Sequence, residues 1–241
     1  MKTLIIELKK AKRTGIILLM PALGLLGSAY ALLNFIVRKD TLLSLPLAPM
    51  TILLTQLYGM IMTLNLFGII VAACMIYNIE FKGNAVKKMY VLPIHVPAMY
   101  LCKFLILTIL LSVAAALQNL VLTQIGITSL PEGTFELYPL IIFALYSLIT
   151  AMPALSFMLF IASRFENMWV PLGIGVAGFL SGMALGTSKI SLFLTDPFVV
   201  ILKPAVSMSA EPDVSVMVIA IIETLLFLLA GLWMSAHTHY E

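Results

Sequence analysis

Residues 41–79 read TLLSLPLAPMTILLTQLYGMIMTLNLFGIIVAACMIYNI and contain no charged side chain. A helix needs roughly 20 apolar residues to cross a bilayer, so this run is about twice as long as one membrane span. Pro46 and Pro49 disfavour helix near the start of the run, which places the expected span at residues 52–78.

The composition of the whole chain agrees with this run. Of the 241 residues, 62% are hydrophobic and 10% are charged, whereas soluble domains are about 45–50% apolar and about 25% charged. Such a chain has little room for a soluble catalytic domain, and it is neither a nucleic-acid-binding module nor a secreted disulfide scaffold. The sequence therefore predicts an all-α integral membrane protein that forms a single domain over residues 1–241.

Charges and turn residues separate five further apolar segments, which bring the expected number of spans to six: 16–36, 99–125, 140–162, 168–186 and 214–236. An even number of spans places both termini on the same side. Ten of the 14 Lys and Arg residues lie in or beside the N-terminus and the second and fourth connections. Because positive charge is retained inside, both termini are expected in the cytoplasm of a plasma membrane, most simply the bacterial inner membrane.

The first 14 residues form a separate feature. Leu4, Ile5 and Leu8 recur at helical spacing on one face, and basic side chains occupy much of the remainder. This pattern is typical of an amphipathic helix that lies along the membrane surface with its basic side chains toward anionic lipid. A plain positively charged anchor for the first span is the alternative interpretation.

The second connection contains another short amphipathic pattern. Four apolar residues recur at spacings of four, four and three beside three lysines, and prolines follow the pattern: Phe81, Ala85, Met89 and Leu92, with Lys82, Lys87 and Lys88, then Pro93 and Pro97. A helix of this kind rests among lipid headgroups or docks into a groove on a partner protein. The residues alone do not favour either interpretation.

The sequence lacks the motifs of an enzyme. It contains no Gly-Lys dipeptide and hence no Walker phosphate-binding loop, and it has no His-Glu-x-x-His motif or nucleophile elbow. We therefore expect no catalytic site, no metal site and no cofactor in this chain.

The motifs resemble those of a known family of transport proteins. The order Glu80, Gly83-Asn84, Pro93 and Lys103 is similar to the connection between the second and third spans of ABC type-2 permeases, although the residue at Asn84 is usually Thr there. The start of the chain, residues 7–14 followed by a first span that contains Pro21, resembles the permease subunits of lantibiotic immunity transporters.

The resemblance implies partners and a function. A separate ABC ATPase would bind ATP and Mg²⁺ and would dock on the second connection through Glu80, Phe81, Lys82, Gly83, Asn84, Lys87 and Lys88. A second related permease or a second copy of the chain would complete the pore, and the exporter would expel cationic antimicrobial peptides such as lantibiotics from the membrane. Export of another drug, a lipid or a polysaccharide is the alternative within this class, and a non-transporting membrane scaffold or sensor is the alternative outside it.

The fifth expected span contains small residues at regular spacing. Gly178, Gly182 and Gly186 follow one another every four residues, which allows close helix packing in lipid, either within the chain or between subunits. The stretch after it, residues 189–213, contains Pro197 and Pro204 and is expected outside the cell, with a part that dips back into the membrane.

Two ionisable residues fall within the expected spans. Glu223 lies about ten residues into the last span, where an unpaired acid costs around 3 kcal/mol or more. Its expected partner is Asn65 or the pair Gln118-Asn119, and its expected role is either a structural hydrogen bond or binding of a proton or substrate. Lys103, close to the start of the third span, is expected to extend toward the cytoplasmic headgroups.

Overall fold

The computed structural model describes residues 2–81, 96–131, 133–188, 190–207 and 209–237. All of the regular secondary structure in these ranges is helical, and they contain no β-strand. The prediction of an all-α protein is therefore confirmed for this part of the chain. The helices are α1 (Lys2–Thr14), α2 (Ile16–Leu43), α3 (Pro49–Gln56), α4 (Tyr58–Phe81), α6 (Val96–Ser129), α7 (Leu137–Ala162), α8 (Trp169–Leu185), η2 (Ser191–Thr195), α9 (Pro197–Val206) and α10 (Val214–His237).

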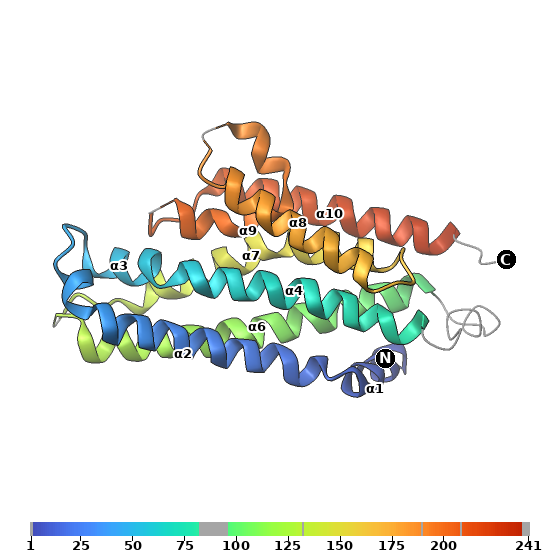
Figure 1. Cartoon of the computed structure of the whole chain (residues 1–241), viewed down its shortest axis with the longest axis horizontal. Helices are drawn as coiled ribbons and strands as arrows, with labels where there is room; N and C mark the ends of the chain where they lie inside the picture. The colour runs from blue at the N-terminus through green and yellow to red at the C-terminus, as the bar shows by residue number, and fades with distance from the viewer. Residues whose placement is uncertain (1, 82–95, 132, 189, 208, 238–241) are drawn as a thin grey trace.

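The long helices run side by side along the longest axis of the molecule (Figure 1). Five helical segments in the described residues are long and apolar enough to cross a membrane: α2, α3–α4, α6, α7 and α10. α8 covers most of the expected fifth span, but its 17 residues stay at the short end of the range for a spanning helix. α1 and the C-terminal end of α10 lie at the same end of the bundle (Figure 1).

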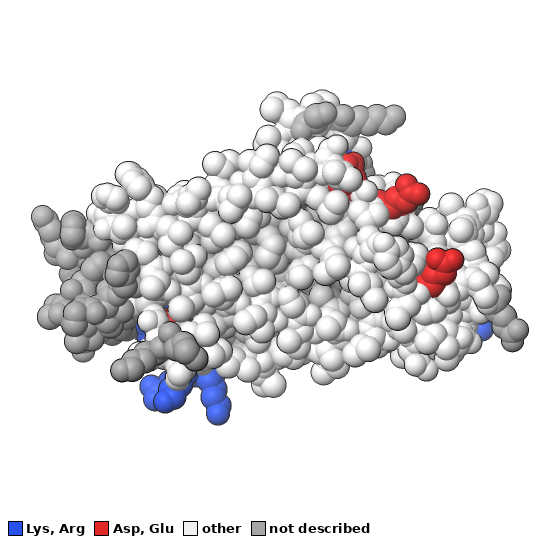
Figure 2. All heavy atoms as spheres, turned by 180° about the vertical axis from the view of Figure 1, so that it is seen from behind, with Lys and Arg blue, Asp and Glu red and all other residues white. Residues whose placement is uncertain are grey.

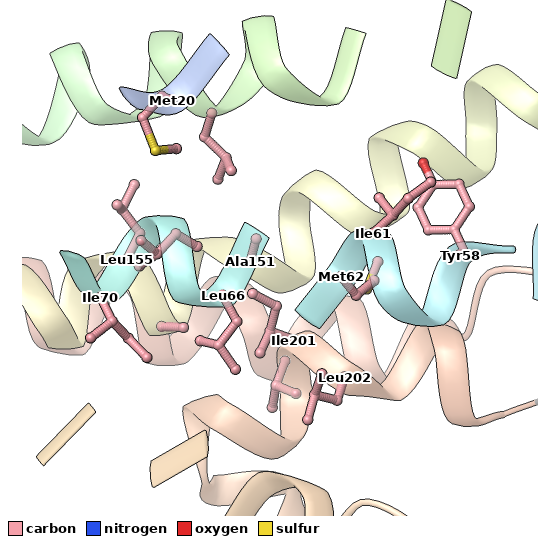
Figure 3. Packing of buried hydrophobic residues seen from close by; sticks show 14 of the residues in the cluster. Met20, Tyr58, Ile61, Met62, Leu66, Ile70, Ala151, Leu155, Ile201 and Leu202 are labelled. Carbon is pink, nitrogen blue, oxygen red and sulfur yellow. The ribbon is translucent and has the colours of Figure 1, made fainter. Parts of the chain in front are cut away.

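α4 and α7 form the centre of the bundle. In α3–α4 and in α7, more than half of the residues in the most apolar stretch of the helix are buried. In α2, α6 and α10 the corresponding share is a third or less. α4 packs on α2, α6, α7, α8 and α9. Met20 of α2, Leu155 of α7 and Ile201 of α9 lie around Leu66 of α4 (Figure 3). A helix that is apolar on all sides is normally buried in this way, which accounts for the charge-free run that α3 and α4 cover.

Two helix boundaries have clear local causes. Gly15, with a φ of 79°, separates α1 from α2 in a left-handed conformation that glycine adopts without strain. The second span was expected from residue 52, and the helix that covers it begins three residues earlier, with Pro49 in the first turn of α3. Proline is accepted there, since the N–H group that it lacks has no partner within the first turn of a helix.

The glycine-rich face of α8 packs within the chain. An added Cβ atom at Gly178 would lie 2.3 Å from the ring of Phe198, and one at Gly182 would lie 2.6 Å from the carbonyl oxygen of Phe198. Gly186 follows as the residue that ends α8. Most of α9 is buried between α4, α7 and α8, so the segment with Pro197 and Pro204 packs into the bundle. Phe198 of α9 thus occupies the space that two of the three glycines leave open.

A Gly182→Ala substitution should test this packing. The new methyl group would meet the backbone of α9, and overpacking of this kind costs about 1–3 kcal/mol. We expect a lower unfolding temperature in detergent than for Gly173→Ala, because no atom lies within 4 Å of the corresponding position at Gly173. Equal unfolding temperatures for the two variants would contradict the close approach of α8 and α9.

Candidate functional site

Four charged side chains from three helices meet at the end of the bundle where α1 lies. Lys10 Nζ is 2.7 Å from Glu7 Oε1 and 3.2 Å from Glu80 Oε1, so it joins α1 to the last turn of α4. Lys103 Nζ, in the second turn of α6, is 2.6 Å from Glu80 Oε1 and also donates to Glu7 Oε2. Two acids and two bases therefore form a closed group without net charge, which we call the ionic cluster.

The ionic cluster is buried. The side chains of Glu7 and Lys103 are each 1% exposed, that of Glu80 is 8% exposed, and only Lys10 reaches the surface at 27%. Charges taken out of water lose several kcal/mol of solvation each, and their mutual attraction offsets this loss only when every member stays in place. The ring of Tyr77, whose centroid is 5.4 Å from Lys103 Nζ, adds a cation–π contact.

The ionic cluster also determines which face of α1 is turned to the bundle. Glu7 and Ala11 are buried, whereas Ile5, Ile6 and Leu8 are exposed. A helix docked by apolar packing would turn those three residues inward. α1 is instead held through its acid, which leaves these three apolar side chains exposed on the outside of the bundle.

The two acids set the protonation of Lys10. Burial disfavours its charged form, but the hydrogen bonds and the negative charges of Glu7 and Glu80 outweigh that effect and raise the pKa of Lys10 above its ordinary value of 10.5. Lys10 is therefore positively charged at neutral pH.

The structure changes the interpretation of two residues. Lys103 does not extend toward the headgroups, because two carboxylates hold it inside the bundle. Glu80 was predicted to contact an ATPase, but its side chain is buried in the ionic cluster, and Phe81 next to it is partly buried. The other predicted coupling residues, Lys82, Gly83, Asn84, Lys87 and Lys88, lie outside the described residues.

Polar side chains within the spanning helices pair with one another. Asn65 donates to Gln118 at 3.0 Å and accepts from it at 2.8 Å, and Tyr58 donates to Asn119 at 3.0 Å. These pairs join α4 to α6 through hydrogen bonds that lipid cannot replace. The expectation that Asn65, Gln118 or Asn119 pairs with Glu223 is wrong, since their amides hydrogen-bond to one another or to Tyr58.

A groove of about 470 Å³ lies between α6 and α7. Its polar residues, Ser112, Asn119 and Thr123, each donate to a carbonyl oxygen one turn earlier in α6. Leu140, Ala144 and Leu148 form the facing wall. Because those donors are used within α6, the groove offers an apolar surface rather than a polar binding site. No group of three His, Cys, Asp or Glu side chains in the described residues is arranged to hold a metal ion.

These features define a multi-pass helical membrane protein with a charged cluster at one end of its bundle. A family model described as ABC-2 family transporter protein matches residues 3–182, well over half of the chain. The chain belongs to the ABC-2 family of transporter proteins, a family of membrane permeases that implies an ABC ATPase partner in general. Comparisons with curated proteins and with solved structures give no match.

Sequence reasoning missed the ionic cluster, although its signal was present. Glu7 is the single acid in an otherwise basic helix, Glu80 follows a long charge-free run, and Lys103 falls within an apolar segment. Each of these charges would be costly to bury alone. Because all three residues are expected near the same face of the membrane, the two acids could have been predicted to pair with the lysine.

A Lys103→Met substitution should destabilise the protein strongly. It leaves Glu7 and Glu80 buried with only Lys10 to balance them, and removing one partner of a buried ion pair costs about 3–5 kcal/mol. Thermal unfolding in detergent is the measurement. The matched control is Lys12→Met on the exposed side of α1, which should stay within about 0.5 kcal/mol of the wild type. Similar losses in both variants would show that Lys103 is not held by the two acids.

From neutral pH upward, the contribution of Lys10 should change only in strongly alkaline solution. Because its pKa is raised in the folded protein, the stabilisation is complete below the unfolded value of 10.5 and is lost as the pH rises through the folded value. The stability difference between wild type and Lys10→Met is therefore expected to be constant from neutral pH to about pH 10 and to shrink above it. A difference that already shrinks between pH 7 and pH 9 would contradict the raised pKa.

Proposed function

We propose that this chain is the permease subunit of an ATP-driven ABC exporter, with six spans and both termini in the cytoplasm. The observation that carries the proposal is the match to the ABC-2 transporter family over residues 3–182. Two features support the orientation. α1 and the end of α10 lie at one end of the bundle (Figure 1), and on the face in Figure 2 the larger group of Lys and Arg side chains gathers where α1 lies.

The proposed energy source is a separate ABC ATPase that binds ATP and Mg²⁺. Its docking element would be the second connection, which starts directly after the last turn of α4. Glu80 in that turn is bound to Lys10 of α1 and to Lys103 of α6. In this proposal the ionic cluster makes α1 and the ends of α4 and α6 one rigid support, against which force from the ATPase is applied.

The proposed substrate is a cationic antimicrobial peptide of the lantibiotic kind, removed from a bacterial plasma membrane. Glu136, Glu211 and Asp213 are exposed before α7 and α10, and acidic side chains lie in the half of the bundle farther from α1 (Figure 2). An acidic outer surface would attract a cationic peptide. A second related permease or a second copy of the chain would complete the transporter.

The test is reconstitution in liposomes. The chain should copurify in detergent with its ATPase, and ATP hydrolysis should rise several-fold on addition of a lantibiotic. A membrane scaffold or sensor would bind a partner without any hydrolysis that responds to a peptide, a lipid or a drug, and that result would refute the exporter. Stimulation by a lipid or by another drug, but not by the peptide, would refute the proposed substrate alone.

Reversing the charge of the second connection should uncouple hydrolysis from the peptide. We expect Lys87→Glu with Lys88→Glu to insert normally and to lose most of the peptide-stimulated ATP hydrolysis, because repulsion would weaken docking of the ATPase. The matched control is Arg38→Glu with Lys39→Glu, two exposed basic residues near the opposite end of α2. Equal stimulation in the two double variants would remove the second connection from the coupling mechanism. Glu80 is unsuited to this test, because its reversal would break the ionic cluster.

A further inference from the structure

Glu223 has no partner for one of its carboxyl oxygens. The residue lies in α10 and is 7% exposed, and its buried Oε2 atom has no hydrogen-bond partner among the described residues. An ionised carboxylate in such a place would lack both water and a donor.

The aromatic contacts of Phe157 place Glu223 close to the start of α9. The ring of Phe157 lies 5.7 Å from that of Phe198 in α9 and 5.0 Å from that of Phe227 in α10, centroid to centroid. Glu223 lies one helical turn before Phe227, and Asp196 precedes Phe198 by two residues. α10 also packs on η2, which ends directly before Asp196, and on α9, which begins directly after it.

Asp196 already uses the donors that the start of α9 offers. Its carboxylate accepts from the Phe198 amide at 2.9 Å and from the Ser181 hydroxyl at 3.0 Å, and its carbonyl oxygen accepts from the amides of Val199 and Val200. Pro197 has no N–H group. The first turn of α9 therefore has no amide left for Glu223.

No base in the described residues is placed to balance Glu223. α7 and η2, which pack on α10, contain no charged side chain, and in α6 the only charged residue is Lys103, which belongs to the ionic cluster. α9 contains Lys203, which lies near the opposite end of that helix and reaches the Gly186 carbonyl oxygen at 3.4 Å. His237 in α10 lies at its C-terminal end.

We propose that Glu223 and Asp196 form a proton-binding pair inside the bundle, in which Glu223 holds the proton and Asp196 holds the negative charge. A proton from water binds the Glu223 carboxylate, and no other bond changes. Loss of that proton would leave two negative charges where α10 packs on η2 and α9, with no cation of the described residues placed to balance them. Their repulsion would separate the start of α9 from α10, so the protonation state would control how α9 packs. The proposal does not depend on the identity of the transported substrate.

Infrared spectroscopy of the full chain in liposomes tests the pair directly. At neutral pH we expect a C=O stretching band from a protonated carboxyl group that is missing in Glu223→Gln, moves to lower frequency in D₂O and disappears reversibly in alkaline solution. The matched control, Glu211→Gln, replaces an exposed acid and should leave the band unchanged. Asp196→Asn should shift the band, because it removes the charge next to the carboxyl group.

Two results would overturn the proposal. If wild type and Glu223→Gln have the same carboxyl bands at neutral pH, Glu223 is ionised and holds no proton. If the Glu223 band is present but does not change in Asp196→Asn, the two residues do not form a pair. Both substitutions nearly preserve side-chain shape, and size-exclusion chromatography checks that each variant is folded. The readout needs no ATPase and no peptide, so it is independent of the proposed transport function.

Discussion

A charge buried inside a lipid-embedded bundle needs an opposite charge or hydrogen-bond donors in the same bundle, because neither water nor lipid can stabilise it there. The ionic cluster meets this requirement with two acids and two bases from α1, α4 and α6. The position of α1 against the bundle and the direction of its apolar side chains depend on these contacts. The neutral amides of Asn65 and Gln118 pair deeper in the bundle for a related reason, since lipid offers no hydrogen-bond partner to either of them.

This arrangement has a mechanical consequence for a transporter permease. The second connection begins one residue after the end of α4, whose last turn is bonded to both neighbouring helices through Glu80. A push on that connection would reach α1 and α6 at the same time. The far side of the bundle, where α8, α9 and α10 meet, contains the only buried acid among the described residues that lies outside the ionic cluster, Glu223.

The sequence predicted the helices well and their contacts poorly. Apolar runs and their flanking charges place helices from residue 16 to residue 237 because a bilayer demands a minimum apolar length. The same runs contain little information about neighbours, since an apolar face packs equally well on a helix or on lipid. Glu223 shows the limit: its cost in the membrane was evident, but its amide partners were wrongly chosen, because sequence does not show that Asn65 and Gln118 pair with each other.

A double-mutant cycle on Glu7 and Lys103 tests the central claim most directly. The unfolding free energy in detergent would be measured for wild type, Glu7→Gln, Lys103→Met and the double variant. Residues that share a buried ion pair should show an interaction energy of about 0.5–3 kcal/mol, so the double variant should be more stable than the sum of the two single losses predicts. Additive losses would contradict the ionic cluster as the interaction that holds α1 to the bundle.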